Sequence, residues 1–452
     1  MPYNSFELAD KTFVTYLDKL FALSVDDLKH MINEMHSEMQ SGLSGYASSL
    51  PMIPSFVSIP EGNEKGHFLA LDLGGTNFRI VKVVLDGKGG ASVTASSKYV
   101  LKKKEIQGTG EDLFKFIALC IKEFISENNI EENEIIDLGF TFSFGVEQTN
   151  IAAGTLIGWS KGFTATGVVG EDVVVCLNEA LRKNGIFNIR VAALVNDTVG
   201  TLVAKNYTDK TCDMGVILGT GTNACYSESM GNITKWRGVR HNKSMIINME
   251  WGIFDKLPLT YYDKFLDKNT ANPNDHILEK MTSGLYLGEL MRLVLRDMSA
   301  RGIYFNEKDT LEFTKISSFK TEYMSRIVED SSLNLLDVEQ FMKEYGFVSI
   351  TKETKEVMKE ISLIIAGRSA KLAGTAIGAV IAWKDPELRE KHTVGIDGSL
   401  FEKFPGYSDM MYKVLNILFG RKAEMIKLDI AKDGSGKGAA IIAAIASKME
   451  RK

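Results

Sequence analysis

Hydrophobic positions along the chain fall into two kinds of segment, short continuous runs and longer runs at helical spacing. Short apolar runs bounded by turn residues are typical of strands, and the longer runs are typical of helices. Strand-like runs occupy residues 68–73, 78–85, 92–101, 135–142, 189–195, 214–218, 245–249 and 393–396. Helical runs occupy residues 5–39, 109–124, 172–183, 354–383 and 436–449. Their alternation predicts an α/β fold in which crossover helices cover sheets.

Three residues mark helix boundaries in this pattern. Ser24 is the expected N-cap of a second segment within the first helical run. Thr109, with Asp112 three residues later, matches the start signal of a helix, and Gly185 is expected to close the helix over 172–183.

Composition restricts the class of protein. The chain has 452 residues, of which 44% are hydrophobic and 25% charged. Because single cores rarely grow beyond about 250–300 residues, we expect at least two lobes. The formal net charge of −5 offers no long-range attraction to phosphate backbones or anionic lipid, so neither nucleic acid nor a membrane is an expected partner.

Cysteine usage and the N-terminal residues indicate a reducing compartment. Cys120, Cys176, Cys212 and Cys225 form no C-x-x-C pair, and three of them lie inside apolar runs, which is typical of buried thiols. Residues 1–11 lack an apolar stretch of signal-peptide length and carry two acids. No other segment approaches the ~18 apolar residues that a membrane span needs. We therefore expect a cytoplasmic globular protein.

The most informative pattern is a duplicated turn. Residues 71–77 read LDLGGTN and residues 217–223 read ILGTGTN, so each has a strand, then glycines, then a hydroxyl. Glycine lets a ligand approach the backbone closely, while N–H groups and a threonine hydroxyl can donate to phosphate oxygens. Two such turns facing each other could hold a polyphosphate from both sides. The alternative is that both are ordinary tight hairpin turns.

Two rival phosphate-binding patterns fit less well. Residues 433–438 hint at a P-loop, but no glycine stands five residues before Gly436 and no Ser or Thr follows Lys437, so that pattern is discarded. Residues 219–224 fit G-x-G-x-x-A, yet the residues after them continue as a strand and do not open a helix. A match of that kind is weak.

Carboxylates follow two of the predicted strands. Asn196 and Asp197 end one apolar run and Glu250 follows another, at sheet edges where ligands are held. The alternatives are that Asp197 caps a helix beginning near Val199 and that Glu250 is an ordinary surface acid. With nearby hydroxyl, amide and lysine groups, these acids form the mixed set of donors and acceptors that reads sugars. Those groups are Ser143, Ser160, Lys161, Asn196 and Asn223.

Several segments, in order over about residues 50–448, resemble the hexokinase family. They are residues 64–79, 139–144, 158–163, 195–198, 219–226, 248–252, 272–289, 394–399 and 433–440. The resemblance implies a two-lobed, actin-like (ribonuclease H-like) α/β sugar kinase fold, with ATP between a small and a large domain and the sugar in the cleft. It implies an N-terminal helical segment over 1–66 that packs on the large domain, a small domain over 67–197, a large domain over 198–436, and a C-terminal helix over 437–452 that returns towards the small domain.

The resemblance also assigns roles to residues. It implies that Asp197 is the general base that takes the proton from the 6-hydroxyl of a hexose. It implies sugar contacts from Ser143, Phe144, Ser160, Lys161, Asn196, Asn223, Glu250, His276 and Glu279. It implies contacts on the ATP side from Asp72, Gly74, Gly75, Thr76, Asn77, Arg79, Gly219, Thr220, Gly221, Thr222, Ser399, Gly434 and Ser435. ATP and Mg²⁺ are the expected cofactors, with Asp72 holding the metal through water.

Four positions depart from the family pattern. Gly145 stands in place of proline, Ser160 and Ser399 in place of threonine, and His276 in place of glutamine. The serines keep a hydroxyl, and Gly145 is expected to loosen the loop that carries Ser143. Histidine is shorter than glutamine and can gain a charge, so sugar preference and its pH dependence are the properties most open to change.

The reaction implied by the resemblance is phosphorylation of a hexose at the start of glycolysis, with the lobes closing on the sugar. Glucose is the expected substrate, mannose and fructose are alternatives, and the protein is expected to be a monomer or homodimer. Two other functions stay open. One is a sugar sensor that keeps the fold without turnover, and the other is a kinase or scaffold that uses another phosphoryl donor or merely binds nucleotide.

Overall fold

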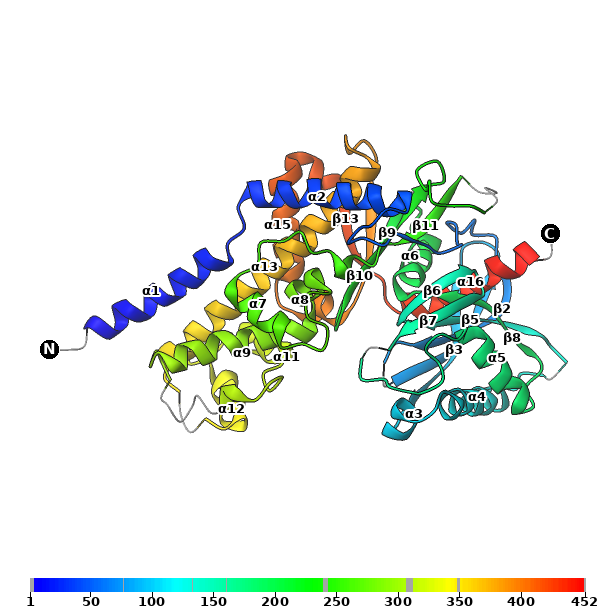
Figure 1. Cartoon of the computed structure of the whole chain (residues 1–452), viewed down its shortest axis with the longest axis horizontal. Coiled ribbons are helices and arrows are strands. Elements are labelled where there is room, and N and C mark those ends of the chain that lie inside the picture. The colour runs from blue at the N-terminus through cyan, green and yellow to red at the C-terminus, as the bar shows by residue number, and fades with distance from the viewer. Residues whose placement is uncertain are drawn as a thin grey trace.

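The computed structural model describes residues 4–75, 77–131, 133–159, 161–238, 243–305, 312–347 and 350–450. It has two lobes, each built on its own β-sheet (Figure 1). The strands are β1 (Ile53–Pro54), β2 (Lys65–Leu73), β3 (Asn77–Asp86), β4 (Ala91–Val100), β5 (Ile136–Phe142), β6 (Gly145–Asn150), β7 (Ala153–Gly158), β8 (Ile189–Val195), β9 (Cys212–Leu218), β10 (Thr222–Ser229), β11 (Ser244–Asn248), β12 (His392–Asp397) and β13 (Ile426–Ile430). The α-helices are α1 (Asn4–Phe21), α2 (Val25–Ser44), α3 (Lys103–Gln107), α4 (Gly110–Glu127), α5 (Val173–Lys183), α6 (Asp197–Thr208), α7 (Tyr261–Lys268), α8 (Ile277–Thr282), α9 (Gly284–Ala300), α11 (Thr321–Glu329), α12 (Leu336–Tyr345), α13 (Lys352–Lys384), α14 (Ser399–Lys403), α15 (Tyr407–Phe419) and α16 (Gly434–Glu450).

The sheets of the two lobes share one topology. The small-lobe order is β4-β3-β2-β5-β8, and the large-lobe strands β11-β10-β9-β12-β13 repeat it, with β1 added beside β11. In both sheets the first three strands are antiparallel and the next two join in parallel. The two predicted glycine turns occupy corresponding hairpins, β2–β3 and β9–β10. The expected α/β fold is therefore confirmed, and the duplicated turn belongs to a duplicated sheet.

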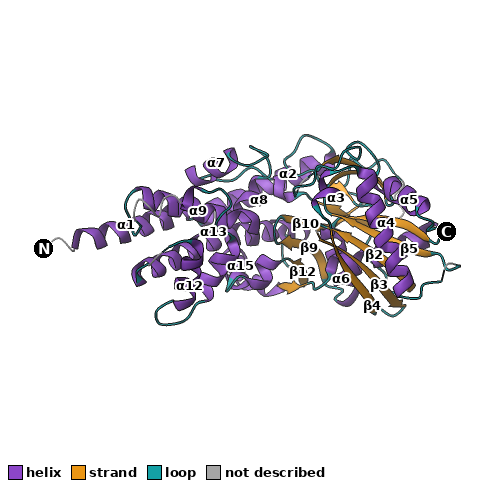
Figure 2. Cartoon of the chain, turned by 90° about the horizontal axis from the view of Figure 1, so that it is seen from below, coloured by secondary structure: helices purple, strands orange, loops and turns teal. Residues whose placement is uncertain are grey.

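The small-lobe sheet is covered on both faces, which explains its continuous apolar strands. Successive side chains of a strand point to opposite faces. Leu69 and Leu71 of β2 pack in one core with α4 and α5, while Phe68 and Ala70 pack in another with α6 and α16. Figure 2 shows α4 and α5 over the outer side of this sheet.

Two helices tie the lobes together at close-packed glycines. α6 leaves β8 of the small lobe and packs on β9 of the large lobe, whereas α16 leaves the large-lobe sheet and packs on β2 and β5. A Cβ atom on Gly438 would lie 1.9 Å from the Gly200 carbonyl oxygen, and one on Gly139 would lie 2.0 Å from that of Ala439. Only glycine permits backbones to approach this closely. The helices begin beside the residues that carry the chemistry discussed below.

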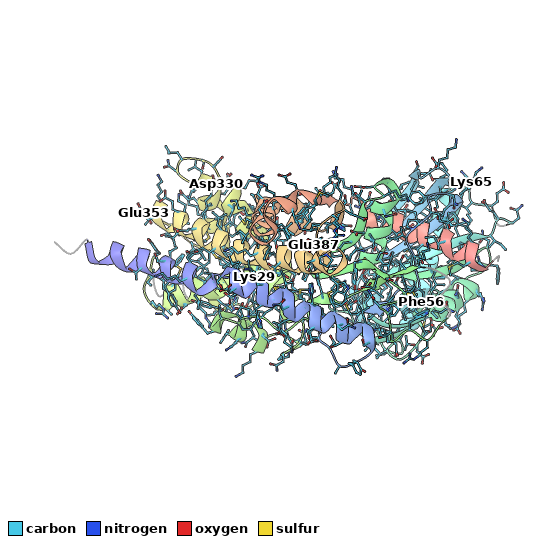
Figure 3. All side chains as sticks on the ribbon, turned by 90° about the horizontal axis from the view of Figure 1, so that it is seen from above. Lys29, Phe56, Lys65, Asp330, Glu353 and Glu387 are labelled. Carbon is cyan, nitrogen blue, oxygen red and sulfur yellow. The ribbon has the colours of Figure 1, made fainter. Side chains whose placement is uncertain are left out.

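The rest of the large lobe is mostly helical. α13 runs through its core against α2, α9 and α15, and α1 extends outward to the left in Figure 1. Figure 3 shows Lys29 of α2 above the large lobe and Lys65 of β2 at the far end of the small lobe. In the described part of the chain, α13 alone is long and apolar enough to cross a membrane, and 83% of its apolar window is buried, as in a core helix. This corrects the expectation that no segment approaches that length.

Local predictions agree with the structure at most helix ends. Ser24 accepts the N–H of Asp27 and caps α2, and Thr109 caps α4 in the same way. All four cysteines are free thiols and three are buried, as expected. The domain boundaries given above stay predictions.

Candidate active site

Three strands, two from the small-lobe sheet and one from the large-lobe sheet, deliver carboxylates to the region where the lobes meet. Asp72 lies near the end of β2, Asp197 follows β8, and Asp397 ends β12. The negative charge of Asp197 raises the pKa of both Asp72 and Asp397, so the three groups lie close enough to interact. Both lobes therefore contribute to one acidic site at strand ends, as is typical of α/β proteins.

Asp197 is the first residue of α6. Asn196 is the N-cap, because its Oδ1 accepts from the Thr198 N–H at 2.9 Å and from the Thr198 hydroxyl at 2.6 Å. Asp197 Oδ1 also accepts from the Thr198 N–H, at 2.9 Å. The alternative that Asp197 caps a helix beginning near Val199 is therefore wrong.

A second charged group joins β2, β3 and the start of α16. The Ser435 hydroxyl donates to Asp72 Oδ2 at 2.6 Å. Arg79 Nη1 donates to Asp433 Oδ1 at 2.6 Å, and its Nη2 lies 3.8 Å from Asp72 Oδ2. Burial raises the pKa of Asp72, against the opposing effects of Ser435 and Arg79. The hydrogen bond from Arg79 lowers the pKa of Asp433.

Asp397 supports a prediction about pH. Burial, followed by the charges of Asp197 and Asp72, raises its pKa from the ordinary 3.8 to about 6. Folding thus favours the protonated acid. The resulting contribution to the free energy of unfolding is fully present below pH 3.8, and it is lost as the pH rises through about 6. Asp397→Asn should stabilise the ligand-free protein at pH 7.5, by on the order of 2 kcal/mol. Urea unfolding should show this gain shrinking towards pH 4.5, and a pH-independent gain would contradict the assignment.

On the large-lobe side, side-chain hydrogen bonds join the start of β10 to the end of β11. Asn223 Nδ2 donates to Asn248 Oδ1 at 2.9 Å, and Asn248 Nδ2 donates to Glu250 Oε1 at 2.7 Å. Glu250 has a left-handed backbone, with φ of 52°. Burial raises its pKa, against the hydrogen bond from Asn248. The Asn248 amide thus orients Glu250.

Glu279 faces the second glycine turn. Its Oε2 accepts from the Thr222 N–H at 3.0 Å, and a Cβ atom on Gly221 would lie 2.6 Å from that oxygen. A side chain at 221 would therefore displace the Glu279 carboxylate from this position. Burial raises the pKa of Glu279, while the charges of His276 and Lys161 lower it. Lys161 belongs to the small lobe and Glu279 to the large lobe, so their electrostatic interaction acts between the lobes.

Lys161 and Ser143 lie together on the small-lobe side. Lys161 Nζ donates to the Ser143 carbonyl at 2.8 Å and lies 5.4 Å from the centroid of the Phe144 ring. The Ser143 N–H donates to the Leu73 carbonyl at 3.2 Å, which joins the ends of β5 and β2. Phe144 is buried among other aromatic rings, and its ring packs against the Lys161 ammonium.

His276 precedes α8 in a left-handed conformation, with φ of 53°. Its Nδ1 lies 2.8 Å from Asp275 Oδ2 but makes no hydrogen bond within the described residues. Burial raises the pKa of both Glu250 and Glu279, and a positive charge on the His276 ring would lower both. The structure therefore brings His276 together with the two acids.

The second glycine turn is fixed by α9. The Gly284 N–H donates to the Gly219 carbonyl at 2.7 Å, and the Leu285 N–H donates to the Thr220 carbonyl at 3.1 Å. The Thr220 side chain stays exposed. By contrast, the Thr222 hydroxyl donates to a backbone carbonyl and accepts from an indole N–H, so it supports the turn from inside.

The remaining predicted residues occupy element ends. Gly74 and Gly75 form the β2–β3 turn, Asn77 begins β3, Ser399 begins α14 and Gly434 begins α16. Thr76 and Ser160 lie outside the described residues.

Sequence reasoning missed two carboxylates of this site. Asp397 follows an apolar run, which is the signal that identified Asp197, and could have been found in the same way. Asp433 follows β13 in a turn, and only its contact with Arg79 in the fold reveals it.

The site fits a magnesium nucleotide better than a bare metal ion. Among the described residues, no three His, Cys, Asp or Glu side chains gather closely enough to hold an ion. Mg²⁺ usually keeps several waters and binds one or two carboxylates together with substrate phosphates. Asp72, partly exposed beside Asp397 and Arg79, suits that mode.

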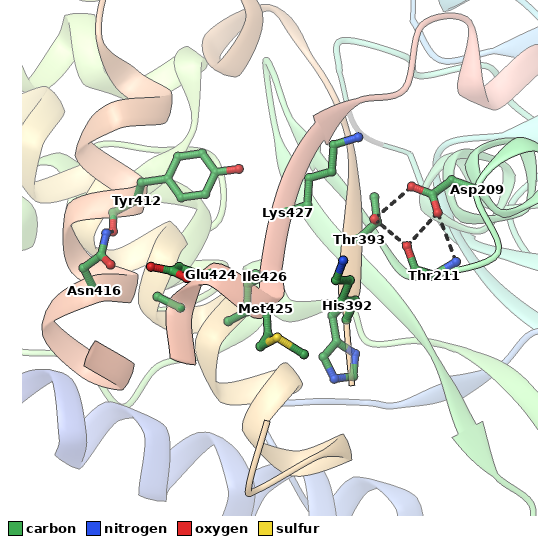
Figure 4. A pocket seen from close by; sticks show the side chains of 12 residues that line it. Asp209, Thr211, His392, Thr393, Tyr412, Asn416, Glu424, Met425, Ile426 and Lys427 are labelled. Carbon is green, nitrogen blue, oxygen red and sulfur yellow. Dashed lines mark hydrogen bonds between the residues drawn. The ribbon is translucent and has the colours of Figure 1, made fainter. Parts of the chain in front are cut away.

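A cavity of about 530 Å³ lies where β12 and β13 begin, at the end of β12 away from Asp397 (Figure 4). Three of its polar residues bond to one another, since Asp209 accepts from the hydroxyls of Thr211 at 2.6 Å and Thr393 at 2.9 Å, and Tyr412 OH accepts from the N–H of the neighbouring Leu428 at 2.7 Å. It contains none of the predicted site residues.

Two family models, both described as hexokinase, match residues 14–207 and 213–445. The chain is 38% identical to a hexokinase of Kluyveromyces lactis, and the alignment covers 96% of this chain and 91% of the relative. It is also 38% identical to hexokinase-like 1 protein of Arabidopsis thaliana, covering 95% of this chain and 90% of the relative. The chain spans only 48% of human hexokinase HKDC1, at 38% identity. The solved structure of a Schistosoma mansoni hexokinase complexed with glucose superposes with a TM-score of 0.87 at 33% identity, covering 96% of this chain and 99% of that one.

Proposed function

Because this chain belongs to the hexokinase family, we propose that it transfers the terminal phosphoryl group of ATP to the 6-hydroxyl of a D-hexose, with glucose as the preferred substrate. The observation that supports this most strongly is the position of Asp197. After burial, the charge of Asp197 raises the pKa of Glu250 on the large-lobe side and of Asp72 in the Asp72–Ser435–Arg79 group, so it interacts with both.

Asp197 is proposed as the general base. Its carboxylate at the start of α6 accepts the proton of the attacking hydroxyl as the bond to phosphorus forms. A base in this role typically contributes about 10²- to 10⁴-fold to the rate. Phosphoryl transfer otherwise requires in-line positioning and charge stabilisation, which fixed strand ends can supply.

The sugar is proposed to lie against both lobes. Glu250, Glu279 and Asn223 accept or donate to its hydroxyls from the large lobe, and Asn196 and Lys161 do so from the small lobe. Because carboxylates accept from hydroxyls without competing donors, they favour a sugar over an anion. A ligand that bonds to both lobes draws them together, which excludes water when the base is assembled.

The nucleotide is proposed to lie between the two glycine turns. Arg79, Thr220 and the N–H groups of the turns donate to its phosphates, while Asp72 holds Mg²⁺ through water. When bound, Mg²⁺ would neutralise part of the negative charge of the phosphates. Ser435 keeps the Asp72 carboxylate oriented through their 2.6 Å hydrogen bond.

The product identifies the reaction. Incubation with Mg-ATP and glucose, followed by ³¹P NMR, should show glucose 6-phosphate and ADP in equal amounts. A sugar sensor would bind glucose and form neither. Phosphorylation that proceeds with pyrophosphate and fails with ATP would indicate a different donor.

His276 is expected to set part of the sugar response to pH. The imidazole charge lowers the pKa of Glu250 and Glu279, so its removal in His276→Gln should raise both. The two acids would then be protonated at a higher pH, and the rise in glucose KM on acidification should begin at a higher pH than in the wild type. KM for glucose and fructose between pH 5.5 and 8 measures this, with KM for ATP as the control. An unchanged pH profile and unchanged sugar selectivity would refute the role.

A further inference from the structure

Lys280 buries a charged ammonium beside the proposed sugar site. It follows Glu279 on α8, and its side chain is only 3% exposed. Its Nζ donates to Asp267 Oδ1 at 2.7 Å and to the Asn272 carbonyl at 2.6 Å. An ammonium buried in this way is costly unless its donors are well paired. Its partners therefore show what it holds.

Asp267 binds the same segment from α7. Both of its carboxylate oxygens accept from the Asn274 N–H, each at 3.0 Å. Its carbonyl accepts from the Thr270 hydroxyl at 2.7 Å. Residues 269–276 connect α7 to α8 without forming a helix or strand. The ion pair thus fixes this connection from its two ends.

The connection needs such support, because it contains unfavourable backbone conformations. Asn274 has φ of 62° and His276 has φ of 53°. Left-handed conformations of residues other than glycine are unfavourable and persist where the surroundings enforce them. The His276 carbonyl accepts from the backbone N–H of residue 280 at 3.0 Å, which places Lys280 in the first turn of α8. Glu279 projects from that turn.

We propose that Lys280 and Asp267 form a positioning pair for the sugar site, which holds His276 and Glu279 in the orientation that binds a hexose. The inference rests on the proposed function. Neither residue of the pair is assigned a contact with the sugar, and their effect is exerted through the backbone of residues 269–276 and α8. A displacement of about 1 Å at such a site can cost on the order of 10²-fold in activity.

The chain contains a matched control for this lysine. Lys355, at the start of α13, is 4% exposed and donates to Glu339 Oε2 at 3.1 Å and to the Asn334 carbonyl at 2.5 Å. It therefore pairs with one carboxylate and one loop carbonyl, as Lys280 does. Its elements, α12 and α13, carry none of the proposed site residues.

The test compares Lys280→Met with Lys355→Met in the full chain. Both should lower Tm by a similar amount. Only Lys280→Met should raise the glucose KM, by about tenfold or more, with KM for ATP changed less than about twofold. Asp267→Asn should act in the same direction with a smaller loss of Tm, and it carries the test if Lys280→Met does not fold. A glucose KM in Lys280→Met and Asp267→Asn equal to that of Lys355→Met would overturn the inference.

Calorimetric titration with glucose alone separates this inference from the proposed function. A wild type that binds glucose without producing ADP would overturn the proposed function, while weaker glucose binding in Lys280→Met than in Lys355→Met would still support the positioning pair. A wild type that turns over glucose, with equal glucose affinity in the two variants, would overturn the pair alone.

Discussion

Replacing Asp197 by alanine is expected to lower kcat about 10²- to 10⁴-fold while glucose binding is retained. The variant removes the carboxylate proposed to accept the proton of the sugar hydroxyl. It leaves Asn196 as the N-cap of α6, because the bonds from Asn196 to Thr198 involve other atoms. Steady-state kinetics with Mg-ATP and glucose, together with calorimetric glucose titration, measure the two effects separately.

The control for this variant is Glu111→Ala. Glu111 also lies in the first turn of a helix, α4, but is 76% exposed and distant in the chain from every site residue. It tests whether loss of a first-turn acid, with its helix-dipole interaction of about 0.3–1 kcal/mol, affects turnover by itself. A kcat in Asp197→Ala within about tenfold of the wild type would exclude Asp197 as the general base.

Replacing Arg368 by methionine is expected to reduce the free energy of unfolding by about 3–5 kcal/mol. Arg368 of α13 donates to both oxygens of Asp263 of α7, at 2.7 Å each, and the two side chains are 2% and 5% exposed. The guanidinium also lies 4.6 Å from the Phe21 ring, so it joins α1, α7 and α13. Without it, a buried carboxylate loses its counter-ion. Urea unfolding measures the loss.

Two further variants separate the buried charge from lost packing. Arg368→Met combined with Asp263→Asn removes both charges and leaves an acceptor for Thr260, which Asp263 also binds at the start of α7, so part of the stability should return. Glu387→Ala breaks an exposed pair with Lys422, whose side chains are 64% and 55% exposed, and should cost less than about 1 kcal/mol. A loss in Arg368→Met as small as that in Glu387→Ala would contradict the expected role of the pair.

Local sequence signals predicted the site where a strand ends in a polar residue. Asp197 and Glu250 follow apolar runs, and the structure places both in one electrostatic group. The two glycine turns likewise predicted a duplication, and the two sheets repeat one strand order. These features could be predicted because each depends on a few consecutive residues.

Features that depend on distant contacts could not be predicted in this way. Lys280 and Asp267 lie on different helices, and a buried ion pair leaves no periodic pattern in the sequence. Gly200 and Gly438 look like weak points within helices, yet the crossing of α6 and α16 requires them. The alternative start of α6 near Val199 arose because two adjacent residues, Asn196 and Asp197, both suit an N-cap, and only the structure distinguishes them.

Release of ADP from Mg-ATP, measured with and without glucose, tests the proposed reaction most directly. The electrostatic interaction of Asp197 with Glu250 and with Asp72 predicts that ADP release is strongly stimulated by glucose and depends on Asp197. A wild-type protein that binds glucose but shows no glucose-dependent release of ADP would contradict the proposed kinase activity.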